Sequence, residues 1–239
     1  MSVKIENGVQ LFARVLQGNA PQKMENIHPH LFPHGGPWYN QVIEIYSSSN
    51  LNLHNDLLIE LMARAVLPRT LHSTFKECRV IFLRTDFQIH FLKVIKTMEK
   101  LVSDKVVDKN RVVRDSLQRL VLLDCFDEEQ LLVTFHNLAH LINNCQSHAG
   151  LIILDNSLSF YWNRKMMNSN TMLSFDKYSS MIIESLYEKV RDLNIVVMFG
   201  RLNVIKPCNL ASYSIEVTKD GATVKDLEKK DTYTANLVL

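Results

Sequence analysis

Short runs of β-branched and aliphatic residues alternate along this chain with longer segments of helical periodicity. Five such runs have the length and composition of strands: Val42–Ile45, Val80–Leu83, Leu120–Leu123, Leu151–Leu154 and Ile195–Phe199. After each of the first four, apolar residues recur three and four positions apart. This alternation is typical of βαβ units around a parallel sheet, so the sequence predicts an α/β fold.

The pattern also predicts the helices and one central, buried strand. We expect a helix that opens at Asp56 and stops before Pro68, which cannot continue it. Three further helices are expected around the apolar positions of residues 87–101, 131–142 and 182–193. The run Leu151–Leu154 is apolar without alternation, which predicts a central strand covered on both faces.

The carboxyl-terminal part has a different period. Tyr213, Ile215 and Val217 alternate with polar residues, Asp220-Gly221 is a candidate hairpin turn, and residues 233–239 form a candidate last strand. The sequence therefore predicts antiparallel strands added to a parallel core. We expect one domain, with a helix and linker in 1–38, the core in 39–200 and a β extension in 201–239.

Composition excludes several classes of protein. The chain has 239 residues and a net charge of +2, so bulk charge gives no reason to infer binding to nucleic acid. Its apolar runs are far shorter than the ~20 residues that a membrane span needs, and residues 1–10 show no apolar secretory segment. The four cysteines form no C-x-x-C pair, which favours buried, reduced thiols.

Histidines are the remaining candidates for a metal site. His28, His30 and His34 lie close together, and His136 and His140 are four residues apart. Neither group has a carboxylate or thiolate at a spacing that would complete a ligand set. We therefore predict loop and helix-surface histidines, and no metal site.

Ligands of open parallel sheets bind at the carboxyl ends of the strands, so the residues after each strand are informative. The segment after the first strand, Ser47–Asn55, contains no glycine and no lysine. A phosphate-binding loop needs glycines that let backbone N–H groups approach phosphate, and a lysine that neutralises it. Ser48, Ser49, His54 and Asn55 occupy its place here, so ATP hydrolysis is not expected.

Acidic and basic residues follow three other strands. Asp155 follows the fourth strand, where a carboxylate can orient a hydrated Mg²⁺, although an acid at a strand end also serves capping or solubility. Asp86 follows the second strand and could orient a water molecule. Arg201 follows the fifth strand.

Several segments, in order from about residue 6 to residue 200, resemble the RecA-type recombinase paralogues of eukaryotes. They are Glu6–Gly8, Leu11–Leu16, Val42–Tyr46, Ala63–Pro68, Thr85-Asp86 and, most specifically, Leu151–Trp162. The resemblance implies a RecA-like P-loop NTPase core, a mostly parallel sheet flanked by helices. It also implies that Asp155 matches the magnesium-site acid and Asp86 the acid that positions water. Here the P-loop is degenerate.

The resemblance implies a non-catalytic subunit of a nuclear recombinase-paralogue complex that supports homologous recombination and double-strand-break repair. The expected partner is another paralogue, of the D type, and single-stranded DNA would be met only within the complex. No cofactor is expected; the alternative is ATP with Mg²⁺ held weakly or through a partner. An active DNA-dependent ATPase, using an unconventional Ser/Asn loop with Arg201, remains a second interpretation.

A single-stranded-DNA-binding module is a third interpretation. Basic residues outnumber acidic ones between positions 93 and 119, and the family's first DNA-binding loop would correspond to 163–174. The DNA-binding candidates are Lys93, Lys96, Lys100, Arg111, Arg164 and Lys165. A solvated helix face explains the first four equally well. Leu11, Phe12 and Val15 on a short helix are candidates for binding a partner.

Overall fold

The computed structural model describes residues 24–48, 53–104, 106–143, 149–167, 173–202 and 205–237. In these residues eight strands form one sheet. The strands are β1 (Val42–Ser47), β2 (Arg79–Arg84), β3 (Leu120–Asp124), β4 (Ala149–Leu154), β5 (Val196–Leu202), β6 (Ala211–Thr218), β7 (Gly221–Asp226) and β8 (Asp231–Ala235). The helices are α2 (Leu53–Val66), α3 (Phe91–Leu101), α4 (Lys109–Leu117), α5 (Glu128–Asn143), α6 (Tyr161–Met167) and α7 (Phe175–Val190).

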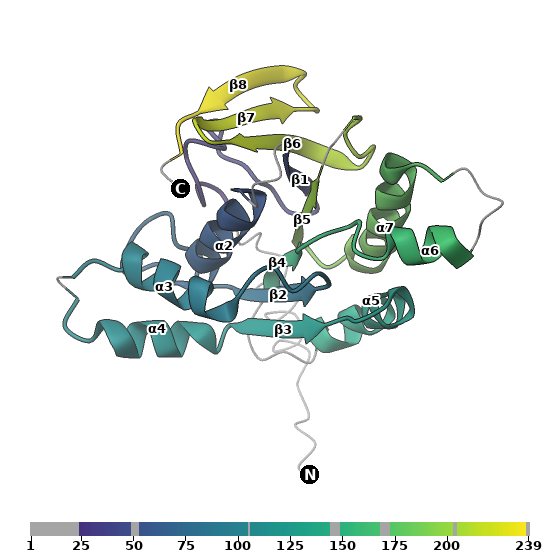
Figure 1. Ribbon diagram of the computed structural model, residues 1–239. Helices are drawn as coiled ribbons and strands as arrows, with labels where there is room; N and C mark the ends of the chain where they lie inside the picture. The colour runs from purple at the N-terminus through teal and green to yellow at the C-terminus, as the bar shows by residue number, and fades with distance from the viewer. Residues whose placement is uncertain are drawn as a thin grey trace, which may run out of the picture.

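The sheet has the strand order β3-β2-β4-β5-β1-β6-β7-β8. All pairs from β3 to β6 are parallel, whereas β6–β7 and β7–β8 are antiparallel. The predicted α/β class, the mostly parallel sheet and the antiparallel carboxyl-terminal strands are confirmed. Figure 1 shows the antiparallel strands extending the sheet beyond β1.

Helices cover both faces of the parallel strands, and each face has its own apolar core. Successive residues of a strand point to opposite faces, so Ile43 and Ile153 pack with α2 and α3, while Val42 and Ile152 pack with α5 and α7. All six residues of β4 are buried, as predicted for a central strand. Figure 1 shows α2, α3 and α4 on one side of the sheet and α5, α6 and α7 on the other.

The boundaries of two helices differ from the prediction. Helix α2 begins at Leu53, not at Asp56, and already buries His54 and Asn55 in its first turn. Helix α3 begins at Phe91, because Phe87 has a positive φ of 61° and stacks its ring on Phe126 at a centroid distance of 5.1 Å. When the first turn of a helix buries polar side chains, the spacing of apolar residues does not show where the helix begins.

Two helices and a strand boundary were not anticipated. Helix α4 buries only Val113 and Ser116, and α6 buries only Tyr161, so neither carries a long apolar stripe. Strand β8 spans Asp231–Ala235, whereas the predicted strand was 233–239. The predicted helix with Leu11, Phe12 and Val15 lies outside the described residues.

The described cysteines, Cys78, Cys125 and Cys208, are buried and free; Cys145 lies outside the described residues. Among the described helices, none is long and apolar enough to cross a membrane.

Candidate nucleotide site

Most of the predicted nucleotide-site residues gather where the parallel strands end. In the order β2-β4-β5-β1, the carboxyl ends of adjacent parallel strands meet at one edge of the sheet. Asp86 follows β2, Asp155 follows β4, and His54 and Asn55 lie in the first turn of α2, which follows β1. Ser48 is exposed at the end of β1, and Ser49 lies outside the described residues.

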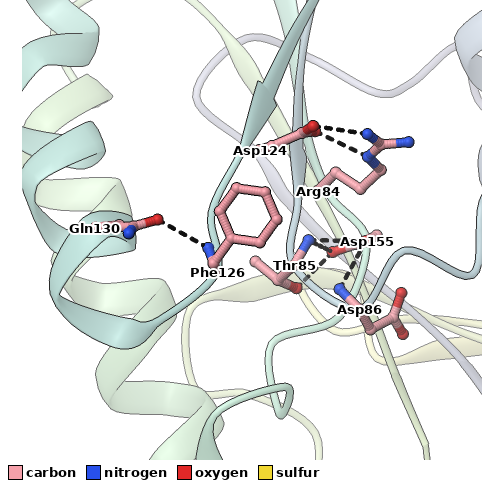
Figure 2. Close-up of polar contacts among 7 residues, drawn as sticks. All are labelled: Arg84, Thr85, Asp86, Asp124, Phe126, Gln130 and Asp155. Atoms are coloured by element: carbon pink, nitrogen blue, oxygen red, sulfur yellow. Dashed lines mark hydrogen bonds and ion pairs between the residues drawn. The ribbon is translucent and has the colours of Figure 1, made fainter.

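Asp155 is fully buried, and donors of its own chain surround its carboxylate. Oδ1 accepts hydrogen bonds from the Thr85 hydroxyl at 2.6 Å, from the Thr85 N–H at 2.9 Å and from the Asn156 N–H at 2.8 Å. Oδ2 accepts from the N–H groups of Thr85 at 2.9 Å and Asp86 at 3.2 Å (Figure 2). The carboxylate therefore ties the end of β2 to the end of β4.

A second carboxylate lies beside the first. Asp86 is half-buried; its Oδ1 accepts from the Gln88 N–H at 3.1 Å and its Oδ2 from the Asn156 side-chain amide at 3.2 Å. Burial, and after it the charge of Asp86, raises the pKa of Asp155 to about 7, while the hydrogen bonds from Thr85 act in the opposite direction. The two acids are thus coupled by charge and by shared neighbours.

The segment after Asp155, which carries the family resemblance, forms a closely bonded turn. Ser159 Oγ lies 2.6 Å from the Thr85 hydroxyl and donates to the Asn156 carbonyl at 3.1 Å. The buried Ser157 hydroxyl lies 2.7 Å from that of Ser179 in α7. These side chains hold the turn against β2 and α7, which gives each of them a structural role.

His54 stands where a phosphate-binding loop has its lysine. Its side chain and that of Asn55 are only 2% and 4% exposed. Burial lowers the pKa of His54, although the charges of Asp86 and Asp56 oppose this shift. At neutral pH the site therefore holds an uncharged imidazole in place of an ammonium group. Within the described part of the chain, His54 Nδ1 and Asn55 Oδ1 have no hydrogen-bond partner.

Gly200 in β5 has no side chain, which lets the backbone of Asp155 and the ring of His54 lie close to β5. A Cβ atom at this position would lie 2.2 Å from the backbone oxygen of Asp155 and 3.1 Å from His54 Cδ2. The Gly200 carbonyl also accepts a hydrogen bond from the Ser157 N–H at 2.9 Å. Only glycine fits at this point, and the space beside it is filled by protein.

The residues at this edge do not fit a magnesium-bound nucleotide. Mg²⁺ prefers carboxylate oxygens and water in an octahedral shell, whereas both oxygens of Asp155 already accept hydrogen bonds from buried backbone groups. No lysine follows β1 to neutralise phosphate. Among the described residues, no group of three or more His, Cys, Asp or Glu side chains is placed to hold a metal ion.

Arg201 does not join this site. In β5 its neighbour Gly200 faces α2, so the Arg201 side chain points to the opposite face, where Glu44 and Asp176 contact it. The interpretation in which Arg201 helps to hold a nucleotide beside Asp155 has no support in this geometry.

The basic candidates form no single surface. On α3, Lys96 and Lys100 are exposed, while Lys93 is paired with Asp56. Arg111 on α4 lies 3.7 Å from Asp115. Figure 1 shows α3 and α4 at the opposite end of the molecule from α6.

The candidates on α6 differ in their surroundings. Arg164 is paired with Glu128 of α5. Lys165 is exposed, and its ammonium lies 5.2 Å from the centroid of the Trp162 ring and 5.6 Å from that of Tyr161. The Trp162 side chain is 57% exposed.

The sequence analysis missed a group of residues at the ends of β2 and β3. Arg84 and Asp124 form a two-pronged ion pair with distances of 2.8 and 2.7 Å (Figure 2). The Arg84 guanidinium lies 4.9 Å from the centre of the Phe87 ring, which stacks on Phe126. An Arg and an Asp at equivalent ends of neighbouring strands were the signal that could have revealed this pair.

Leu11, Phe12 and Val15, the predicted partner-binding residues, lie outside the described part of the chain. Compared with protein-family models and with curated proteins, the sequence matches none of them. The functional assignment therefore depends on the resemblance carried by short sequence segments and on the chain's own geometry.

Proposed function

We propose that this protein is a RecA-like subunit without ATPase activity, which acts in the nucleus within a recombinase-paralogue complex and supports homologous recombination and double-strand-break repair. Its partner in this proposal is an ATP-binding paralogue of the D type. The part played by this chain is structural: it presents a folded α/β surface to the partner and helps to place recombinase on single-stranded DNA.

The bonding of Asp155 supports the part of the proposal that concerns ATPase activity, whereas the paralogue complex and its role in repair depend on the resemblance of Leu151–Trp162 and the other segments. A magnesium-site acid must leave oxygen lone pairs open to water or metal, yet Asp155 is 0% exposed and accepts hydrogen bonds from four donors of Thr85, Asp86 and Asn156, with the Thr85 N–H shared between both oxygens. Together with the lysine-free segment before α2, this removes the electrostatic stabilisation of phosphoryl transfer, which is worth several kcal/mol in active enzymes.

The sheet topology is compatible with a RecA-like core. Strand β5 lies between β1 and β4, so the carboxyl end of β1, the start of α2 and Asp155 lie near the end of one strand. This is the relation expected between a phosphate-binding loop and its magnesium-site acid. The fold arrangement therefore supports descent from a nucleotide-binding architecture, while the residues support loss of the ligand.

Exposed apolar side chains support assembly with a partner. Leu122 on β3 is 39% exposed, Phe126 is 65% exposed and Val133 on α5 is 59% exposed. Strand β3 ends the sheet, and among the described residues it pairs only with β2. An edge strand flanked by exposed apolar side chains is a typical protein-interaction surface.

Two measurements test the proposal. Calorimetric titration of the purified chain with ATP and Mg²⁺ should give no saturable heat at ~1 mM nucleotide, with Asp192→Asn as a surface control that behaves identically. Purification of the tagged chain from cells, followed by mass spectrometry, should recover a recombinase paralogue. Saturable ATP binding that Asp86→Asn weakens would support the rival ATPase, and recovery of no paralogue would contradict the proposed complex.

The exposed Trp162 and Lys165 favour a second candidate, a single-stranded-DNA-binding module. An aromatic ring beside a cation is a suitable stacking platform for a base. If this chain binds DNA by itself, Trp162→Ala should weaken binding at least about fivefold, given ~1–3 kcal/mol per stacked base. Phe126→Ala, an equally exposed aromatic residue on another surface, is the matched control.

A further inference from the structure

A buried arginine lies on the face of the sheet opposite the candidate nucleotide site. Arg201 in β5 is 1% exposed and Glu44 in β1 is 0% exposed. Arg201 Nε lies 2.7 Å from Glu44 Oε1, an ion pair that lacks the alignment of a hydrogen bond. The other Glu44 oxygen accepts from the Ser214 hydroxyl of β6 at 2.9 Å, and the backbone of Cys208 also donates to this carboxylate.

The same guanidinium extends to two further segments. Its Nη1 lies 3.1 Å from Oδ1 of Asp176, in the first turn of α7. Its Nη2 donates a hydrogen bond of 2.5 Å to the carbonyl of Lys206, in the segment after β5. Arginine suits this position because its rigid planar group carries five N–H donors that can serve several partners at once.

Burying these charges is expensive. Desolvation of an ion pair offsets most of its attraction, and apolar residues of similar size are often equally or more stabilising. Overall stability therefore gives a weak reason for this cluster. The cluster instead fixes the relative positions of several segments, because Arg201 contacts Lys206 and Asp176, and Glu44 contacts Cys208.

The two segments held by Arg201 are the walls of a cavity. The cavity has a volume of about 550 Å³ and lies between the start of α7 and the residues after β5. Its lining includes Ser174, Asp176, Lys177, Lys206, Pro207 and Asn209. Arg201 forms an ion pair with Asp176 of one wall and donates a hydrogen bond to the Lys206 carbonyl of the other.

We propose that Arg201 is a positioning residue that holds the start of α7 and the segment after β5 in one arrangement on β1. This inference rests on the proposed function. It follows that the arrangement needs no nucleotide, because the Arg201 guanidinium and the carboxylates of Glu44 and Asp176 hold the two segments in place of a bound ligand. The surface around residues 173–178 and 205–209 is then permanently ready for a partner.

Asp176→Ala is the variant that tests the contact without removing the buried pair. Asp176 is about one-quarter exposed, so the Glu44–Arg201 pair and the core should survive. In hydrogen-exchange mass spectrometry, we expect the backbone amides of residues 173–178 to exchange roughly fivefold faster, because the loss of a partly exposed ion pair has an effect of about this size. Strands β1 and β5 should exchange at the unaltered rate. Glu188→Ala, an exposed acid on the same helix, should change nothing.

Arg201→Lys separates the role of Arg201 from a direct effect of Asp176 on the helix. A lysine keeps the charge beside Glu44 but cannot contact all three partners, so both 173–178 and 205–208 should exchange faster. Adding Asp176→Ala to Arg201→Lys should then have little further effect. Additive effects, or unaltered exchange in Asp176→Ala, would overturn the positioning role.

A separate arm adds ATP and Mg²⁺ at ~1 mM to the unaltered chain. Unchanged exchange in both segments is the expected result. Slower exchange at 205–208 would overturn the nucleotide-independent arrangement together with the proposed function, whereas the comparison of Asp176→Ala with Glu188→Ala judges the positioning role of Arg201 by itself.

Discussion

At the scale of single residues, the hydrogen bonds of Asp155 make this acid part of the scaffold that joins two strand ends. Thr85, Asp86 and Asn156 all direct donors at its carboxylate. The sequence predicted an acid at the end of β4 and left open whether it orients a metal or only caps the chain. Hydrogen bonds from the neighbouring strand favour the structural role, and no local pattern in the sequence could reveal those bonds.

Asp155→Asn should therefore be strongly destabilising. An amide places an NH₂ group where backbone N–H donors converge, and a buried donor left unsatisfied costs about 1–3 kcal/mol. We expect urea unfolding at pH 8 to show a loss of about 3 kcal/mol. Asp86→Asn, at a half-buried position, should lose less than about 1 kcal/mol. Equal and small losses in both variants would contradict a scaffold role for Asp155.

The same pair of acids predicts a pH dependence. The pKa of Asp155 is raised to about 7 in the folded state, above the ~3.9 of an unfolded chain, so the folded protein binds this proton more tightly. The stabilisation that comes from binding a proton at Asp155 is then fully present below pH ~4 and is lost as the pH rises through about 7, whereas the hydrogen bonds to its carboxylate remain.

Asp86→Asn should reduce this loss, because it removes the charge that is the second cause of the raised pKa. Thermal melts of the unaltered chain and of Asp86→Asn between pH 5 and pH 8 measure the difference, with Asp192→Asn as the control. Parallel curves for Asp86→Asn and the unaltered chain would show that the two acids are not coupled.

At the scale of elements, periodicity predicted the parallel strands and the central place of β4, but it did not predict the small helices. Strand β4 was correctly placed at the centre because its apolar run does not alternate. Helices α4 and α6 were not predicted, because each buries few residues and so shows no apolar stripe in the sequence. The start of α2 escaped because His54 and Asn55, both polar, are buried there through packing against the ends of other strands.

The basic residues of α3 and α4 are best tested together. Because Lys93 and Arg111 have acidic partners, and Lys96 and Lys100 are exposed, we expect these helices to form a solvated face. Replacing Lys96, Lys100 and Arg111 by Gln should leave single-strand affinity and its salt dependence unchanged in the isolated chain. Stability should change by less than ~0.5 kcal/mol per substitution.

A contrary result for these helices has a clear signature. If they contact phosphates, the slope of log affinity against log salt should fall by about two units for the triple variant, at ~0.7 per single-strand phosphate contact. Fluorescence anisotropy at several salt concentrations measures that slope.

At the scale of the whole molecule, the sheet ends differently on its two sides. Strand β8 has mostly polar exposed residues, whereas β3 exposes Leu122. We expect the isolated chain to self-associate through β3. Leu122→Lys should increase the monomer fraction in sedimentation velocity with little change in stability, since a charge on an edge strand opposes pairing. Thr232→Lys on β8 should have no effect, and a monodisperse unaltered monomer would contradict the expectation.

In the proposed function, this chain contributes structure and not a nucleotide site. The most direct measurement is the number of ATP molecules bound per purified heterodimer of this chain with the ATP-binding paralogue proposed as its partner, determined by equilibrium dialysis with Mg²⁺ at saturating nucleotide. We expect about one ATP per heterodimer, held by the partner and unaffected by Asp86→Asn in this chain. Two ATP molecules per heterodimer, one of them lost on Asp86→Asn, would contradict it.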